Sequence, residues 1–148
     1  MSTKAHAARF VPRTGSLEMR VRYADTDKAA VVHHAAYLSF LEAGRIELFR
    51  EHGFDYAAFE RETGTGLPVI DLRVRYRAPA RFDDLVKVTS HVSDVSRFSV
   101  WIRGVIERDG VVLVESTVKL ACVGMVTEAP LRMPRAFFDA LLEEGYEI

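Results

Sequence analysis

The chain has 148 residues, a length that fits one domain with a substantial core. It is 49% hydrophobic and 28% charged, and its 20 basic and 21 acidic residues leave no net field to attract nucleic acid or an anionic membrane. The single cysteine, Cys122, excludes an internal disulfide and a multi-thiolate zinc site, and it agrees with a cytoplasmic location.

The N-terminal segment carries basic residues but lacks the apolar stretch of a secretory signal. We therefore expect a flexible lead-in over residues 1–14 and a single domain over residues 15–148. No apolar run approaches the roughly 20 residues needed to cross a bilayer, so we expect no membrane insertion.

The first half of the domain predicts one strand followed by two helices. Apolar and charged residues alternate strictly over residues 17–23, which indicates a half-buried strand. Helical spacing then runs over residues 37–52, with the start between His33 and Tyr37 and Gly53 as a left-handed C-terminal cap. A shorter helix is expected between Asp55, as its N-cap, and Gly64.

The second half predicts four strands and a final helix. The strands cover residues 69–79, 84–95, 98–107 and 111–123, and the pair Asp109-Gly110 favours a type I′ hairpin between the last two. A helix follows over residues 133–144, with Pro134 at its first position. Consecutive strands without crossover helices predict an antiparallel sheet of α+β class, wrapped on one long central helix.

The stretch YADTDKAAVVHHAAY, residues 23–37, concentrates the candidate chemistry. Asp25, Asp27, His33, His34 and Glu42 offer metal-binding donors, but adjacent histidines point apart and no HExxH pattern occurs, so we expect no metal site. A nucleophilic triad is not expected either, because there is no G-x-S-x-G elbow and the cysteine lies in an alternating strand.

Two interpretations of this stretch remain. Unpaired N–H groups at a helix N-terminus can hold an oxyanion, and a nearby carboxylate can attack a carbonyl or activate water. Alternatively, the aspartates simply form an Asx-turn, which physical reasoning alone favours.

The pattern Y-x-D-T-D-x-x-x-V-V-x-H-x-x-Y-L-x-F-L-E-x-x-R, residues 23–45, resembles the signature of the 4-hydroxybenzoyl-CoA thioesterase group of acyl-CoA thioesterases, in the hotdog-fold superfamily. The similarity continues through LPVIDLRVRYRAPARFDDLVKV into the last strands. It implies a sheet of about five strands around one helix, a homodimer joined at the sheet edges or a homotetramer, and active sites between subunits. It implies no cofactor.

The resemblance also implies roles for individual residues. Asp27 matches the catalytic carboxylate, as nucleophile or general base, and the backbone amide of His34 matches the donor that polarises the thioester carbonyl. The sequence departs from the family pattern where Ala30 replaces glycine, His33 replaces tyrosine and Ala36 replaces asparagine. Alanine at position 30 means that the loop avoids positive φ there or accepts some strain.

Further candidates have weaker support. Glu42 and Arg45 are three residues apart on the central helix and are expected to pair, and Glu42 matches the catalytic carboxylate of another thioesterase clade. Supporting roles are also considered for His33 and Tyr23. Candidate substrate-binding residues are Tyr37, Arg75 and Arg77. The two arginines form a row with Arg73. This row is either a solvated face, a contact for coenzyme A phosphates or a contact with a second subunit.

The expected function is therefore hydrolysis of an acyl-CoA thioester. Two alternatives stay open: a thioesterase acting on acyl carrier protein, and a hotdog module that binds acyl-CoA without turnover.

Overall fold

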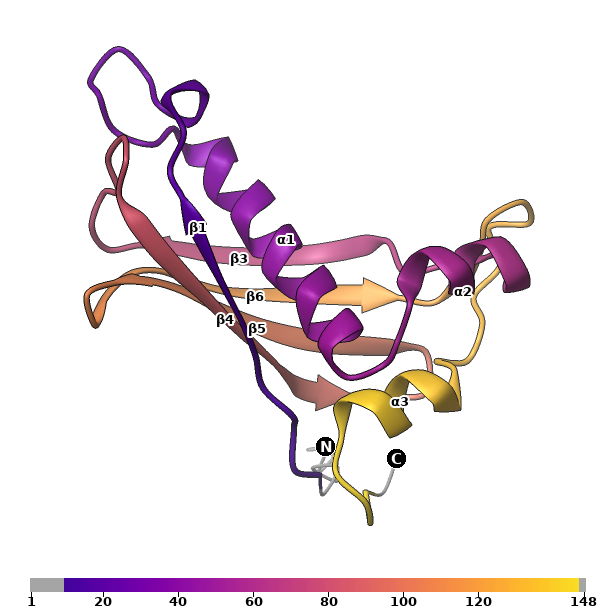
Figure 1. Cartoon of the computed structure of the whole chain (residues 1–148). Coiled ribbons are helices and arrows are strands. Elements are labelled where there is room, and N and C mark those ends of the chain that lie inside the picture. The colour runs from indigo at the N-terminus through magenta and orange to yellow at the C-terminus, as the bar shows by residue number, and fades with distance from the viewer. Residues whose placement is uncertain (1–9, 147–148) are drawn as a thin grey trace, which may run out of the picture.

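A five-stranded antiparallel sheet in the order β1-β4-β5-β6-β3 forms the body of the computed structural model, which describes residues 10–146. The strands are Gly15–Arg20 (β1), Val69–Tyr76 (β3), Leu85–Val95 (β4), Ser99–Arg108 (β5) and Val111–Ala121 (β6). Helix α1, His34–Glu51, lies across one face of this sheet (Figure 1). The predicted α+β architecture, with an antiparallel sheet wrapped around one long helix, is confirmed.

The predicted turns and caps are also confirmed. Asp109 and Gly110 both have positive φ, as a type I′ hairpin between β5 and β6 requires. Helix α2, Tyr56–Thr63, begins where the Asp55 carboxylate accepts the N–H of Ala58 at 3.0 Å, and it ends at Gly64 in the left-handed conformation. Gly53, with φ 87°, follows the last turn of α1.

The ends of other elements differ from prediction. Strand β1 ends at Arg20, and Tyr23–Asp25 forms a short 3₁₀ turn (η1), so Tyr23 is 79% exposed instead of facing the core. Pro134 is the N-cap of α3, Arg135–Leu141, not its first helical residue. A short antiparallel pair, Thr65–Gly66 (β2) with Val123–Gly124 (β7), was not predicted.

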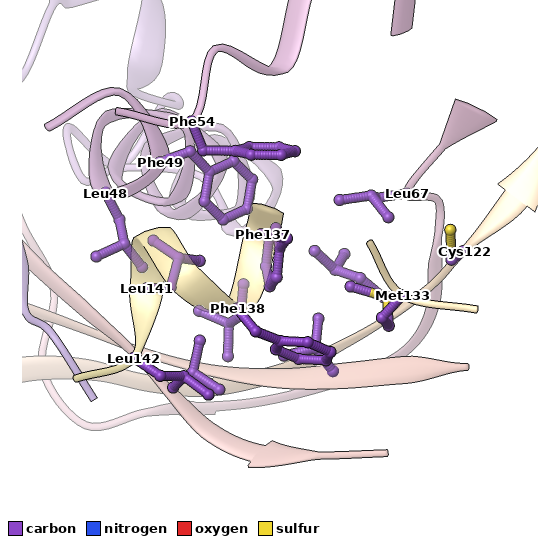
Figure 2. Close-up of a cluster of buried hydrophobic side chains, with 14 of the residues drawn as sticks. Leu48, Phe49, Phe54, Leu67, Cys122, Met133, Phe137, Phe138, Leu141 and Leu142 are labelled. Carbon is purple, nitrogen blue, oxygen red and sulfur yellow. The ribbon is translucent and has the colours of Figure 1, made fainter. Parts of the chain in front are cut away.

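The core lies between the helices and the inner face of the sheet, in two clusters. One cluster joins the C-terminal half of α1 to α3, where the rings of Phe49, Phe54 and Phe137 meet edge to face (Figure 2). Cys122 is buried in this cluster, as expected of a small apolar residue. The second cluster packs the first turns of α1, including Tyr37 and Phe40, on β4, β5 and β6.

Part of the expected N-terminal lead-in, residues 1–9, lies outside the described residues. Residues 10–14 lie against the C-terminal helix. The guanidinium of Arg13 donates to the backbone carbonyls of Asp139, Ala140 and Leu142. The backbone N–H of Arg13 donates to the carbonyl of Leu141. Within residues 10–146, no helix has both the length and the apolar character that a membrane span requires.

Strand β3 is an edge of the sheet and is unusually exposed. The predicted alternation places Leu72, Val74 and Tyr76 on the inner face, and the strand register confirms this parity. Nevertheless Leu72 is 43% exposed, and Val69 and Ile70 are more exposed still. The other edge, β1, packs against α1. An apolar edge strand left this open is a surface that proteins normally cover.

Candidate active site

The connection from β1 to α1 is anchored by Asp25, which is 5% exposed. Its carboxylate accepts the backbone N–H of Arg22 at 2.8 Å and two donors of the Arg22 guanidinium, at 2.9 and 3.3 Å. Its backbone oxygen accepts the N–H of His33 at 3.0 Å. Asp25 therefore ties the end of β1 to the start of α1, and both oxygens of its carboxylate are engaged.

Two opposing effects act on the pKa of Asp25. Burial raises it, because a carboxylate loses solvation away from water. Hydrogen bonds from the side chain and backbone of Arg22 lower it by more, and the net pKa lies below the usual range for aspartate. Asp25 is thus a structural anion, held charged at neutral pH.

Asp27 differs from Asp25 in that its side chain is exposed. Its Oδ1 accepts the N–H of Ala29 at 2.8 Å, and its backbone N–H donates to Val31 at 2.9 Å. The Asx-turn interpretation is therefore confirmed for this residue. Within residues 10–146, no donor reaches the second oxygen, Oδ2, so one carboxylate oxygen holds the turn and the other is available for chemistry.

The same turn places Ala30 in the left-handed region, with φ 63°. The loop therefore does not avoid positive φ at Ala30 but accepts strain there. The left-handed conformation costs an L-residue about 1 kcal/mol or more.

We expect Ala30→Gly to raise the free energy of unfolding by about 0.5–1 kcal/mol, because relief of the strain exceeds the added chain entropy of glycine. Urea denaturation measures the difference. Ala29→Gly is the matched control and should lower stability by about 0.5 kcal/mol, since φ at Ala29 is not positive. Equal effects of the two substitutions would contradict the strain at Ala30.

Helix α1 begins with His33 as its N-cap, whose Nδ1 accepts the N–H of Ala36 at 3.2 Å. This bond requires a neutral ring with its proton on Nε2. The His33 N–H is used by Asp25, but within the described part of the chain the N–H groups of His34 and Ala35 have no acceptor. The capped helix start thus presents free N–H donors and partial positive charge to solvent.

His33→Ala should lower the free energy of unfolding by about 1 kcal/mol, because the cap is lost. His33→Asn should restore at least the wild-type value, since asparagine is a preferred N-cap. Thermal or urea unfolding of both variants tests the cap. Equal losses for alanine and asparagine would mean that His33 acts in some other way.

A hollow of about 250 Å³ opens beside this helix start. His34, Tyr37, Tyr76 and Arg77 line it, together with Val31, Val32, Ala78 and Pro79. The Tyr76 ring lies 4.9 Å from the His34 ring and 5.5 Å from the Tyr37 ring, centroid to centroid, and its hydroxyl donates to the His34 carbonyl at 3.2 Å. The wall therefore combines three rings with small apolar residues and one arginine.

The structure brings the predicted residues together only in part. Asp27 does not line the hollow. Its backbone N–H donates to the carbonyl of Val31, and Val31 is one of the lining residues. Tyr37 lines the hollow with its ring while its buried hydroxyl accepts the N–H of Ala80 at 2.9 Å, so it is also a structural residue. Tyr23 packs edge to face on Phe82 at the surface.

The predicted ion pair between Glu42 and Arg45 is wrong: within residues 10–146, no ion pair within 4.0 Å joins them. Glu42 is exposed on α1 and does not line the hollow. Arg45 is half-buried, and this burial lowers the pKa of its guanidinium, an effect that Glu42 and Tyr56 oppose from a distance. Asp27 does not line the hollow either, but its backbone N–H bonds to Val31, which does, whereas Glu42 lies about two helical turns beyond His34, so the geometry favours Asp27.

The arginine row of β3 divides between two environments. Arg77 lies just after β3, where it lines the hollow, and its guanidinium donates at 2.8 Å to Glu115 on the outer face of the sheet, from which Arg73 and Arg75 also project. Tyr76 lines the hollow but was not among the predicted site residues. Its signal was an aromatic residue at the inward-facing end of a strand. Across residues 10–146, no group of three or more histidine, cysteine or acidic side chains could hold a metal ion.

The chain matches the model of the Thioesterase-like superfamily over residues 21–141. It is 34% identical to the acyl-CoA thioesterase YbgC of Haemophilus influenzae over 120 residues, covering 81% of this chain and 88% of that protein.

Solved structures show the same fold. The DHNA-CoA thioesterase of Staphylococcus aureus superposes with a TM-score of 0.79 at 31% identity, covering 85% of each chain. A mutant 4-hydroxybenzoyl CoA thioesterase complexed with 4-hydroxybenzoyl CoA has a TM-score of 0.81 at 17% identity, covering 86% of this chain and 98% of the other. At that identity, the second likeness bears on the fold alone.

Proposed function

This chain belongs to the Thioesterase-like superfamily and is a thioester hydrolase, and we propose that it cleaves acyl-CoA with Asp27 as catalytic carboxylate and the His34 amide as oxyanion donor. The observation that carries the proposal is the helix start: the His34 N–H has no acceptor among residues 10–146, and the His34 side chain lines the aromatic hollow. A thioester carbonyl lying in the hollow would meet that donor.

The chemistry needs few groups. A thioester carbonyl is electrophilic and its thiolate leaves readily, so an oxyanion donor and one carboxylate suffice. Either Asp27 attacks the carbonyl and expels CoA thiolate, and water then hydrolyses the anhydride, or Asp27 takes a proton from the water that attacks. In both routes one water is consumed, and the free acid and CoA are released.

The site becomes complete only with a second subunit in this proposal. Asp27 is exposed and lies outside the hollow of its own chain, and the apolar edge strand β3 is open nearby. Pairing of β3 with β3 of a partner would cover Val69, Ile70 and Leu72. It would also set each hollow beside a subunit boundary. A homodimer of this kind is the proposed active unit, and its cytoplasmic location stays a prediction.

The double substitution Ile70→Lys with Leu72→Lys should convert the dimer to a monomer and reduce thioesterase activity more than tenfold, because charged side chains oppose burial of the edge. Light scattering coupled to size exclusion gives the mass. Lys substitutions at Val126 and Met125, which are also exposed, serve as the control and should leave the mass unchanged. A wild-type monomer that is fully active would contradict a shared site.

Thiol release across a panel of acyl thioesters tests the function itself. Short, long and aromatic acyl groups are presented on CoA, on pantetheine and on acyl carrier protein. Turnover of CoA thioesters is expected. Turnover restricted to the carrier protein would favour the carrier-specific alternative, and tight acyl-CoA binding without any thiol release would favour a binding module.

A further inference from the structure

Tyr76 connects the edge strand β3 to the start of α1. Its hydroxyl donates to the His34 carbonyl at 3.2 Å, and its ring packs between the rings of His34 and Tyr37, with centroids at 4.9 and 5.5 Å. Tyr37 is itself fixed, because it is buried and its hydroxyl accepts the Ala80 N–H at 2.9 Å. Tyr76 is therefore held both by ring packing and by its hydroxyl, although the side chain is partly exposed.

The bond from Tyr76 is an addition to what the His34 carbonyl needs. His34 is the first residue of α1, and in an α-helix the carbonyl of each residue accepts the N–H four residues further on. A carbonyl oxygen has two lone pairs, so the hydroxyl supplies a second donor to an acceptor that the helix already uses. The bond is therefore better explained by its effect on the rest of the same peptide group.

The His34 carbonyl and the Ala35 N–H belong to one peptide group. A trans peptide group is planar and its N–H points opposite to its carbonyl, so a donor that fixes the carbonyl also fixes the direction of the N–H. Hydrogen bonds in a chain polarise one another, so a bond to the carbonyl also strengthens the N–H as a donor. The Tyr76 hydroxyl thus acts on the Ala35 amide without touching it.

The Ala35 amide lies directly beside the proposed oxyanion donor. Neither the His34 N–H nor the Ala35 N–H has an acceptor among residues 10–146, whereas the next donor, the Ala36 N–H, is taken by Nδ1 and the carbonyl of His33. Ala35 itself does not line the hollow, but His34 and Tyr76, which flank its peptide group, both do. Helix α1 therefore begins with two adjacent free donors, and paired backbone N–H groups commonly form oxyanion holes.

We propose that Tyr76 is a positioning residue for thioester hydrolysis, whose hydroxyl orients and polarises the Ala35 amide as a second oxyanion donor beside the His34 amide. The inference rests on the proposed function and deepens it. As the carbonyl carbon becomes tetrahedral, the thioester oxygen gains negative charge, and the two N–H groups share that charge. No proton or covalent bond moves at Tyr76, so its effect falls on the transition state and not on substrate binding.

Tyr76→Phe removes the hydroxyl and keeps the ring between His34 and Tyr37. It should lower kcat for acyl-CoA about tenfold and leave KM within about twofold of the wild-type value, because the lost effect acts in the transition state. Tyr146→Phe is the matched control: it removes a hydroxyl that donates to Asp139 near the C-terminus, and it should keep wild-type activity. Urea unfolding of both variants shows whether either has lost stability.

Replacement of Ala35 by L-lactic acid distinguishes positioning from a general structural role. This change turns the Ala35 N–H into an ester oxygen and leaves every other side chain unaltered. It should lower kcat about a hundredfold, as loss of one oxyanion donor usually does. Because Tyr76 acts through this N–H, adding Tyr76→Phe to the ester protein should lower kcat by less than about twofold. A full tenfold loss in the ester protein, or a wild-type kcat in Tyr76→Phe, would overturn the proposal.

The carbonyl stretching frequency of a bound thioester makes the test independent of turnover. Infrared difference spectra of isotope-labelled acyl-CoA bound to Asp27→Asn should show this frequency lowered relative to water, and adding Tyr76→Phe should reverse part of the shift. If no thioester is hydrolysed, the proposed function fails, while a carbonyl frequency that depends on the Tyr76 hydroxyl would still support the two-donor arrangement. The same frequency with and without the hydroxyl would contradict it.

Discussion

Asp27→Asn is expected to reduce kcat/KM for acyl-CoA about a thousandfold, within the range typical for loss of a catalytic carboxylate. The substitution is nearly isosteric. The amide oxygen of asparagine can still accept the Ala29 N–H that holds the turn at 2.8 Å, so the loop should keep its shape. What is lost is the ionised oxygen that has no donor among residues 10–146. Thiol release at saturating and limiting acyl-CoA measures the effect.

Glu42→Gln is the matched control for this prediction. Glu42 is the rival carboxylate; like Asp27 it is exposed and outside the hollow, but it lies about two turns into α1, away from the helix start, so its variant should retain at least half of the wild-type activity. Urea unfolding of both variants should agree with the wild type within about 0.5 kcal/mol, as for most surface changes. Full activity in Asp27→Asn, or inactivity in Glu42→Gln, would move the catalytic assignment to α1.

Local patterns in the sequence predicted most of the fold, because each pattern has a local physical cause. Alternation marked the long strands, and Asp109-Gly110 marked the hairpin because both residues take positive φ. The failures lie where tertiary contacts override local preference. The alternation of apolar and charged residues continues through Tyr23. The chain nevertheless forms a 3₁₀ turn that buries Asp25, and the Tyr23 ring is left exposed. The pair β2 and β7 is too short to show any period.

The candidate site was less predictable than the fold. Local patterns could not separate the two aspartates, and only the family resemblance pointed to Asp27. Their physical difference lies in burial: the contacts of Arg22 occupy both carboxylate oxygens of Asp25, while Oδ2 of Asp27 has no donor among residues 10–146. The predicted pairing of Glu42 with Arg45 relied on helical spacing, which permits a contact without requiring it. Tyr76, at the end of β3, lies 4.9 Å from the His34 ring on α1, and its place as an inward-facing aromatic residue did not by itself identify this distant neighbour in the sequence.

Asp25→Asn is expected to lower the free energy of unfolding by about 2–3 kcal/mol at pH 7, the cost of replacing a buried, charge-assisted hydrogen-bond acceptor. Asparagine offers one acceptor oxygen and turns an NH₂ group toward the donors of Arg22, so at least one donor is left unpaired. The His33 N–H should still reach the backbone oxygen at position 25. Helix α1 should therefore persist, on a weaker anchor.

The pH dependence of that loss identifies its cause. Because the net pKa of Asp25 is lowered in the folded protein, its carboxylate contributes stability above the unfolded value of about 3.9, and this contribution fades as pH falls below about 5. The wild-type protein should thus lose its advantage over Asp25→Asn progressively in urea titrations as pH falls from about 5 through the lowered pKa of the folded protein. Asp55→Asn, at an N-cap that asparagine serves equally well, should differ little from wild type at neutral pH. A stability difference for Asp25→Asn that stays constant down to pH 3 would show that packing, and not the carboxylate charge, anchors the start of α1.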